Sequence, residues 1–238
     1  MDKIDKILKT VRVNKMRRLA PNDGSRIITE EECLYAIKEI GKRIVPNFEI
    51  DSENKDAYTK IAAYFMKLDI FENGEYYITA KGYIRKYEFS HEKGILIIGP
   101  TGTGKTDCLR IFDEFCRAFN TQINMKFKRC GEIEANFKEH GYSAVRFNDI
   151  SNYIFDELAQ ESKESTRFND KFNVMPYILQ DSYNKWKQKG VLTFGTSNAN
   201  GDILYDQYGE LCFERICEMF NIIYLTGKNR RPKTIFKK

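Results

Sequence analysis

A run of glycine, threonine and lysine in segment 94–112, GILIIGPTGTGKTDCLRIF, joins an apolar stretch to a helix-like one. Its central residues fit the pattern G-x-x-x-x-G-K-[ST], with a predicted strand before them and a predicted helix after them, as this motif requires. Glycines allow a tight loop with inward-pointing N–H groups, and the N-terminus of the following helix adds a positive field. The chemistry expected of this loop is binding of a nucleoside triphosphate.

The residues expected to bind the nucleotide form one continuous stretch. Lys105 would contact the β- and γ-phosphates, and the Thr106 hydroxyl would hold Mg²⁺. The full set expected to bind ATP is Gly99, Pro100, Thr101, Gly102, Thr103, Gly104, Lys105, Thr106 and Asp107. A glycine-rich turn without a ligand is the alternative, and the complete motif in its required context disfavours it.

Hydrolysis needs two further groups besides the phosphate loop, and an acidic pair in the sequence could provide both. Phosphoryl transfer to water requires a carboxylate near Mg²⁺ and a group that activates the attacking water. Asp156 and Glu157 stand at the end of an apolar strand, 51 residues after Lys105. We expect Asp156 to hold Mg²⁺, through water, and Glu157 to polarise the nucleophilic water. An acidic pair can equally begin a helix, but one crossover in a parallel sheet would bring this pair beside the phosphate loop.

Asn198 is a further candidate at the end of another predicted strand. The segment 191–198, VLTFGTSN, changes from apolar to small polar residues. Ligands of parallel sheets bind at the carboxyl ends of strands, so Asn198 could hydrogen-bond the γ-phosphate or the attacking water. The alternative is a simple polar turn, because the following residues are also typical of turns.

The elements that must position these residues alternate along the second part of the chain. Periodicity predicts strands at 95–98, 123–129, 150–155, 191–196 and 222–225. Between them it predicts helices at 105–120, 132–140, 173–189 and 208–219. Strand–helix alternation predicts an α/β domain, a parallel sheet sandwiched by helices, over residues 86–238.

The residues before this alternation predict a small, mainly helical domain over 1–85. Ile4, Ile7, Leu8 and Val11 give segment 1–20 an amphipathic helical pattern. A capping box at 29–32 begins a second helix, expected to reach about residue 40 and to be ended by Gly41 and Pro46. A helix at 54–68 and a strand at 75–80 complete this unit.

Composition restricts the class of protein. The net charge of +5 is concentrated at the ends, because residues 1–20 hold seven basic and two acidic residues and the last eleven hold six basic and none acidic. Such ends suit contact with a polyanion or an acidic partner, or are simply solvated termini. No apolar run could cross a bilayer or serve as an export signal. Six cysteines without Cys-x-x-Cys spacing are expected to be reduced, mostly buried thiols in a cytoplasmic protein.

Taken together, the motifs GPTGTGKT, YIFDE, TFGTSN, YGELCFER and GKNRR resemble those of AAA+ ATPases. More narrowly, the chain is similar over residues 94–231 to the DnaC/IstB-like group of helicase loaders and transposition ATPases. The resemblance implies a P-loop NTPase fold with little or no C-terminal lid and ATP between the subunits of a homo-oligomer. It aligns Arg215 with the arginine finger that reaches the neighbouring subunit, and Arg231 with the sensor arginine acting in cis, for which Arg230 is the alternative.

The function implied by this resemblance is ATP hydrolysis in DNA replication. A helicase loader would bind single-stranded DNA and a replicative helicase, with segment 1–20 docking on the helicase. The alternatives are a transposition ATPase that assembles on duplex DNA and activates a transposase, a small-molecule kinase, and a module that holds ATP without hydrolysing it. Lys138, Tyr142 and Arg146 are candidate DNA contacts, although Lys138 could equally be an ordinary solvated helix residue.

Overall fold

The fold is built on one five-stranded sheet. The computed structural model describes residues 11–12, 26–27, 29–119, 121, 123–147, 149–167 and 170–231. The strands of the central sheet, in chain order, are β5 (Gly94–Ile98), β6 (Met125–Arg129), β7 (Asn152–Leu158), β10 (Thr193–Ser197) and β11 (Phe220–Tyr224). All of them run parallel, in the spatial order β11-β5-β10-β7-β6. The predicted parallel sheet is therefore confirmed, and β5, which leads into the phosphate loop, lies inside it.

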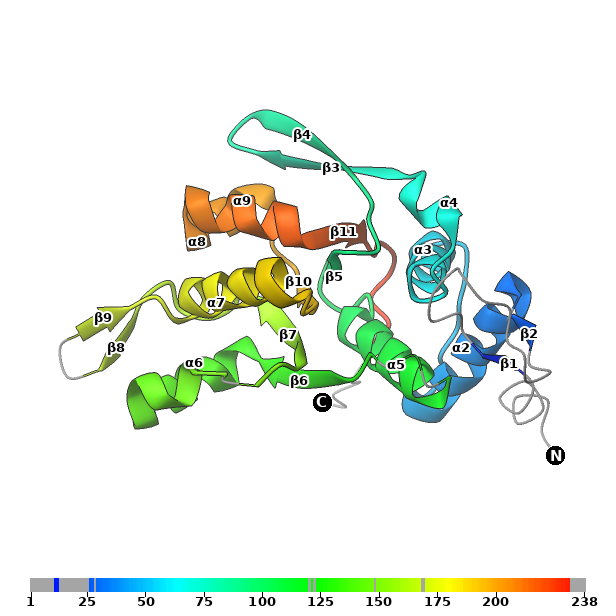
Figure 1. Cartoon of the computed structure of the whole chain (residues 1–238), viewed down its shortest axis with the longest axis horizontal. Coiled ribbons are helices and arrows are strands. Elements are labelled where there is room, and N and C mark those ends of the chain that lie inside the picture. Colours follow the sequence, from blue (N-terminus) through cyan, green and yellow to red (C-terminus); the bar gives the residue numbers. More distant parts are fainter. Residues whose placement is uncertain are drawn as a thin grey trace, which may run out of the picture.

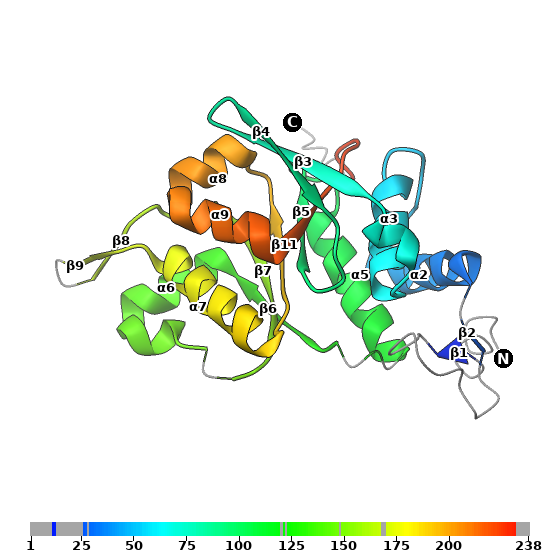
Figure 2. The same cartoon turned by 45° about the horizontal axis from the view of Figure 1, so that its top comes forward.

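Helices cover both sides of this sheet (Figures 1 and 2). One side holds α2 (Glu30–Ile44), α3 (Lys55–Phe65) and α5 (Lys105–Ala118). The other side holds α6 (Cys130–His140), α7 (Val174–Lys189), α8 (Gly201–Tyr208) and α9 (Glu210–Met219). Because both faces are covered, every residue of β5 and of β10 is buried, which explains their continuous apolar or small-residue sequences.

The N-terminal helices pack on the same hydrophobic core as the sheet. The Phe65 ring of α3 stacks on Phe112 of α5 and Phe194 of β10, with centroids 5.3 and 5.9 Å apart. Buried residues of α2 and α3 belong to one cluster with those of the sheet. The division into domains at residue 85 stays a prediction.

Several predicted boundaries differ from the structure. α2 continues past Gly41 to Ile44. The Phe48 ring fills the space beside Gly41, where a Cβ would lie 2.2 Å from it, so glycine is required at this point of the helix. The helix predicted over 208–219 is α9, which begins at Glu210; α8, which ends at Tyr208 and is separated from α9 by Gly209, was not predicted. The helix predicted over 1–20 is wrong at Val11–Arg12, which form β1 and pair in parallel with β2 (Arg26–Ile27). The rest of segment 1–20 lies outside the described residues.

Several short elements were not predicted. The helix α4 (Asp69–Glu72) precedes the expected strand β3 (Glu75–Ala80), and β4 (Tyr83–Glu88) pairs with β3 to make a hairpin. A second hairpin joins β8 (Ser165–Arg167) to β9 (Asp170–Phe172). Short elements of this kind carry too few residues to give a clear periodic pattern.

The six cysteines are buried free thiols, as the sequence indicated. Burial raises the pKa of the Cys108 thiol to about 12. Such a thiol stays protonated and acts as a small apolar side chain. None of the described helices has the length and hydrophobicity of a membrane span.

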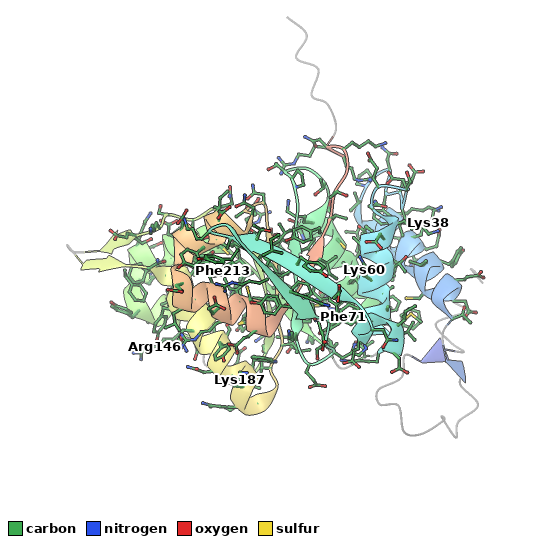
Figure 3. The ribbon with its side chains drawn as sticks, turned by 90° about the horizontal axis from the view of Figure 1, so that it is seen from above. Lys38, Lys60, Phe71, Arg146, Lys187 and Phe213 are labelled. Carbon is green, nitrogen blue, oxygen red and sulfur yellow. The ribbon has the colours of Figure 1, made fainter. Side chains whose placement is uncertain are left out.

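A buried tyrosine is one of the contacts that hold the β3–β4 hairpin on the domain. Viewed from above, the hairpin lies across α8 and α9, close to Phe213 (Figure 3). Tyr76 points inward from β3, and its hydroxyl donates to the Phe220 carbonyl at 2.7 Å and lies 3.3 Å from the Cys217 carbonyl. The neighbouring Tyr77 points outward and is 48% exposed.

We predict that Tyr76→Phe lowers the free energy of unfolding by about 1 kcal/mol, because buried carbonyl groups lose a donor. The melting temperature should fall by about 3 °C. Tyr77→Phe is the matched control on the same strand and should change stability by less than about 0.5 kcal/mol. Thermal unfolding followed by circular dichroism measures both, and equal effects of the two variants would contradict the anchoring role of Tyr76.

Candidate nucleotide-binding site

The phosphate-loop sequence forms a tight turn between β5 and α5. The backbone is left-handed at Gly102 and Gly104, with φ of 85° and 91°. The Lys105 ammonium group lies across this turn and donates to the carbonyl oxygens of Gly99 and Pro100 at 2.7 and 2.8 Å. The Thr103 hydroxyl donates to the Pro100 carbonyl at 2.9 Å. The chain therefore forms the closed loop with a basic side chain above it that the motif predicted.

This loop borders a cleft of about 730 Å³, a volume ordinary for cofactor sites. The structure brings most of the predicted site residues together in its lining: Thr101, Gly102, Thr103, Gly104, Lys105, Thr106, Asp107, Asp156, Glu157, Asn198, Arg230 and Arg231. Apolar and aromatic side chains from before and within α3, Val45, Pro46, Phe48 and Tyr58, line it as well. The cleft thus combines a polar phosphate-type loop with a surface on which a flat base could pack.

Asp156 and Glu157 lie at a β-bulge within β7, whereas the sequence placed them at the end of the strand. β7 continues to Leu158, beyond the predicted end at residue 155. Along the neighbouring strand Gly195 pairs with Phe155 and Ser197 pairs with Leu158, so that Asp156 and Glu157 together face one residue, Thr196. Bulges of this kind redirect side chains and are frequent beside active sites.

The Thr196 hydroxyl organises this bulge. It donates to Asp156 Oδ1 at 2.6 Å and accepts the backbone N–H of Glu157 at 3.0 Å. Asp156 Oδ1 also accepts the Thr106 hydroxyl at 2.8 Å. Asp156 is 2% exposed, whereas the Glu157 side chain is exposed and its φ is +64°. The two neighbouring carboxylates therefore have different environments, one buried against the Thr106 hydroxyl and one open to the cleft.

Asn198 lies across the cleft from this pair and contacts the phosphate loop. Its amide nitrogen lies 3.2 Å from the Thr101 hydroxyl, and its amide oxygen lies 2.7 Å from the Gln160 side-chain nitrogen. Asn198 is exposed and follows the last residue of β10. The predicted position at the carboxyl end of a strand beside the loop is observed.

Burial and nearby charges shift the pKa values of two residues that line the cleft, Lys105 and Asp107. Burial lowers the pKa of Lys105, and the positive charge of Arg231 adds to that effect while the Asp156 carboxylate opposes it. Burial also raises the pKa of Asp107, against the pull of Arg110. An anion beside the amine would act against burial and favour its charged form.

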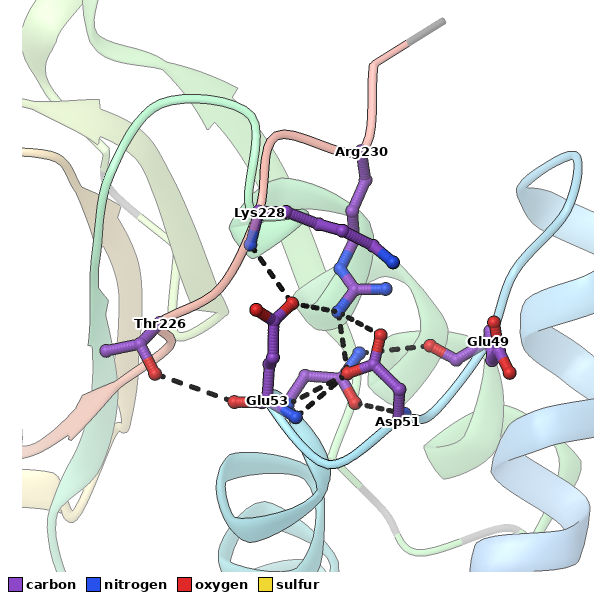
Figure 4. A network of polar contacts seen from close by, with 7 residues as sticks. Glu49, Asp51, Glu53, Thr226, Lys228 and Arg230 are labelled. Carbon is purple, nitrogen blue, oxygen red and sulfur yellow. Dashed lines mark hydrogen bonds and ion pairs between the residues drawn. The ribbon is translucent and has the colours of Figure 1, made fainter.

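The C-terminal segment lies over the phosphate loop, where Asp51 and Glu53 hold Arg230 (Figure 4). Arg230 bonds both oxygens of Asp51, at 2.9 and 2.8 Å, and lies 3.9 Å from Glu53. The Arg230 backbone N–H donates to the Gly102 carbonyl at 2.8 Å. Burial acts to raise the pKa of Asp51, but the bonds from Arg230 and from backbone N–H groups outweigh it, so the pKa is below its usual range. Arg230 is thereby engaged by the residues before α3, whereas Arg231 is exposed at the cleft.

Arg215 is not among the residues that line this cleft. It lies on α9, where its guanidinium carbon is 5.3 Å from the centre of the Tyr183 ring on α7. The candidate DNA contacts also lie elsewhere, on α6 and the 3₁₀ turn Gly141–Val145 that follows it. There Lys138 is paired with Glu134 at 2.6 Å, Tyr142 is 49% exposed and Arg146 is exposed.

Comparison with solved structures identifies the fold. The DnaC helicase loader is 16% identical and aligns with a TM-score of 0.50 over 79% of this chain and 99% of that one. A candidate primosome component from Streptococcus pyogenes serotype M3 is 18% identical, with a TM-score of 0.51 over 82% and 98% of the two chains. DnaA from Aquifex aeolicus, bound to AMPPCP, is 13% identical, with a TM-score of 0.50 over 76% and 51%. No protein-family model and no curated protein matches the sequence.

The chain has a fold similar to that of the DnaC helicase loader. The likeness concerns the fold, and it confirms the P-loop α/β architecture that the sequence motifs predicted. In this fold the phosphate loop follows β5, the acidic pair belongs to β7 and Asn198 follows β10. Since β10 lies between β5 and β7, these groups meet at one edge of the sheet.

Sequence reasoning missed some residues of the candidate site. Thr196 stood within the TFGTSN motif, and a hydroxyl two residues before Asn198 was a signal that could have been used. Asp51 and Glu53 carried no signal, because their partner Arg230 is far away along the chain. The residues at 45–48 that line the cleft belong to no motif.

The residues present fit a magnesium nucleotide. Left-handed glycines make an anion-binding turn at the N-terminus of α5, and Lys105 stands beside it with a pKa lowered by burial. The Thr106 hydroxyl and the Asp156 carboxylate are hard oxygen donors of the kind that Mg²⁺ prefers. Glu157 and Asn198 are the polar groups left to face a water molecule in the cleft.

We predict that Thr196→Val reduces the rate of ATP hydrolysis roughly tenfold or more while leaving the affinity for nucleotide within about threefold. Valine keeps the shape but leaves the Glu157 N–H without its acceptor and removes one donor to Asp156. Turnover at saturating ATP and binding of a fluorescent nucleotide measure the two effects. Thr193→Val, on the same strand and also buried, is the control; an equal loss in both variants would contradict the role of Thr196.

Proposed function

We propose that this chain is an ATP-hydrolysing AAA+ protein of DNA replication that acts as a helicase loader. The observation that carries the proposal is the bulge at Asp156 and Glu157, which faces the phosphate loop across one cleft. The likeness in fold to a helicase loader, a candidate primosome component and DnaA supports the assignment to replication. A module that only held ATP would not need an exposed carboxylate in a strained backbone beside it.

Each residue of the cleft has a distinct task in this proposal. Lys105 and the loop N–H groups bind the phosphates. Thr106 and, through water, Asp156 would hold Mg²⁺, and the ion would supply positive charge at the phosphates. Glu157 orients and polarises the attacking water, and Asn198 hydrogen-bonds the γ-phosphate or that water. Arg231 is the cis arginine, since Arg230 is already bound to Asp51 and acts as a clasp.

Arg215 would act in a neighbouring subunit. Its position on α9, outside the cleft of its own chain, suits an arginine presented to a second copy. A bidentate, permanently charged guanidinium stabilises the charge that develops during phosphoryl transfer. The protein would therefore work as a homo-oligomer with ATP between subunits.

DNA and a replicative helicase are the proposed macromolecular partners. The basic residues at both ends of the chain would contact the sugar–phosphate backbone, and no base-reading motif is present in the sequence. Residues 1–85 would form a partner-docking unit, with the basic segment 1–20 meeting the helicase.

We predict that the protein binds single-stranded oligonucleotides more tightly with ATP and Mg²⁺ than with ADP or no nucleotide. The measurement is fluorescence anisotropy with single- and double-stranded oligonucleotides of equal length, at two salt concentrations. Binding should weaken as salt rises, because contacts to the backbone release counterions. Lys105→Ala is the matched control and should abolish the difference between ATP and no nucleotide.

The other outcomes separate the alternatives. Cooperative, ATP-dependent coating of duplex DNA would contradict the helicase-loader assignment and favour a transposition ATPase. Binding of neither DNA form in any nucleotide state would overturn both assignments. Phosphorylation of a small acceptor would point to a kinase.

A further inference from the structure

The segment 157–161, which begins at Glu157 and continues past the end of β7, is held in a strained conformation. Both Glu157 and Ala159 have left-handed backbones, with φ of 64° and 65°. Non-glycine residues in this region persist only where neighbouring groups hold them, at about 1–3 kcal/mol each. The groups that hold this loop are therefore part of the machinery that places Glu157.

Two of these groups come from the last turn of α8. The Tyr208 hydroxyl accepts the Ala159 backbone N–H at 2.7 Å, and the Gln207 side chain donates to the Glu161 carbonyl at 2.9 Å. Tyr208 is 6% exposed, and the Glu161 carboxyl group is buried near it. Because the Ala159 bond is short and enclosed, the loop cannot shift without moving Tyr208 or losing this bond.

Tyr208 also lies directly before the glycine that separates α8 from α9. The next residue, Gly209, has φ of 79° and ψ of 164°, a conformation that is open to glycine and that turns the chain from α8 into α9. α9 begins at Glu210 and carries Arg215 in its second turn. Tyr208 is thus separated by one residue from the start of the helix that bears Arg215.

We propose that Tyr208 is a positioning residue that couples the Glu157 loop of one subunit to the Arg215 that the same subunit presents to its neighbour. This inference rests on the proposed function, because it needs Arg215 to act in trans. The physical path is short: Glu157, the Ala159 N–H, the Tyr208 hydroxyl, Gly209 and α9. A change in the loop when nucleotide binds or is hydrolysed would alter how well the next site is completed.

The test mixes two variant subunits and measures ATP hydrolysis, so that the rate depends on how one subunit presents Arg215 to the other. Arg215→Ala subunits keep an intact Glu157 loop and need an arginine from a neighbour, whereas Glu157→Gln subunits supply that arginine and cannot hydrolyse ATP themselves. Mixing the two should restore hydrolysis. Replacing the second partner by the double variant Glu157→Gln/Tyr208→Phe should reduce the restored rate roughly fivefold or more. All activity then arises in sites whose own loop is unaltered, so the loss reports only on Arg215.

Controls separate this inference from general damage and from failure of the proposed function. Tyr205→Phe in place of Tyr208→Phe removes a hydroxyl from the same helix, on a ring that packs against Phe213, and should restore the full rate. The double variant should bind nucleotide and co-assemble as Glu157→Gln does. Equal restoration by the single and double variants would overturn the coupling alone. Absence of restoration by Glu157→Gln subunits, with an active wild type, would overturn the trans role of Arg215 and the coupling with it, and an inactive wild type would overturn the ATPase itself.

Discussion

A single buried hydroxyl, that of Thr196, fixes the geometry on which the site depends. Successive residues of a strand point to opposite faces of the sheet, so Asp156 and Glu157 would ordinarily be separated by it. The bulge places both of them opposite Thr196, and the left-handed turn at Glu157 leaves both carboxylates facing one cleft. Thr196 bonds to each of the two residues and is itself fully buried. This arrangement leaves the Asp156 carboxylate buried beside the Thr106 hydroxyl, where it could hold Mg²⁺. It leaves the Glu157 carboxylate exposed, where it could act as a base.

Segments that are distant in sequence meet around this bulge. The phosphate loop comes from between β5 and α5, the C-terminal segment lies over Gly102, and Asp51 from before α3 holds Arg230 in place. The loop that follows Glu157 is tied to α8 and, through Gly209, to the helix that carries Arg215. Direct hydrogen bonds therefore join the surroundings of the cleft to the residues before α3 and to the last turn of α8.

The sequence predicted the sheet, its helices and most of the cleft, because these depend on local patterns. The apolar runs of β5 and β11 and the loop 99–106 are each legible within a few residues. Tertiary contacts could not be predicted in this way. Phe48 packs against Gly41 of α2, Arg230 pairs with a residue far away in the chain, and the hydroxyl that bonds the bulge belongs to a neighbouring strand.

The most direct test of the division of labour between the two carboxylates compares nucleotide affinity and turnover in Glu157→Gln and Asp156→Asn. Binding should be measured with and without Mg²⁺. If the bulge assigns the roles as described, Glu157→Gln binds ATP with Mg²⁺ like the wild type and loses roughly a hundredfold or more in turnover. Asp156→Asn loses the gain in affinity that Mg²⁺ gives. Equal losses of affinity in both variants, or wild-type turnover in Glu157→Gln, would contradict it.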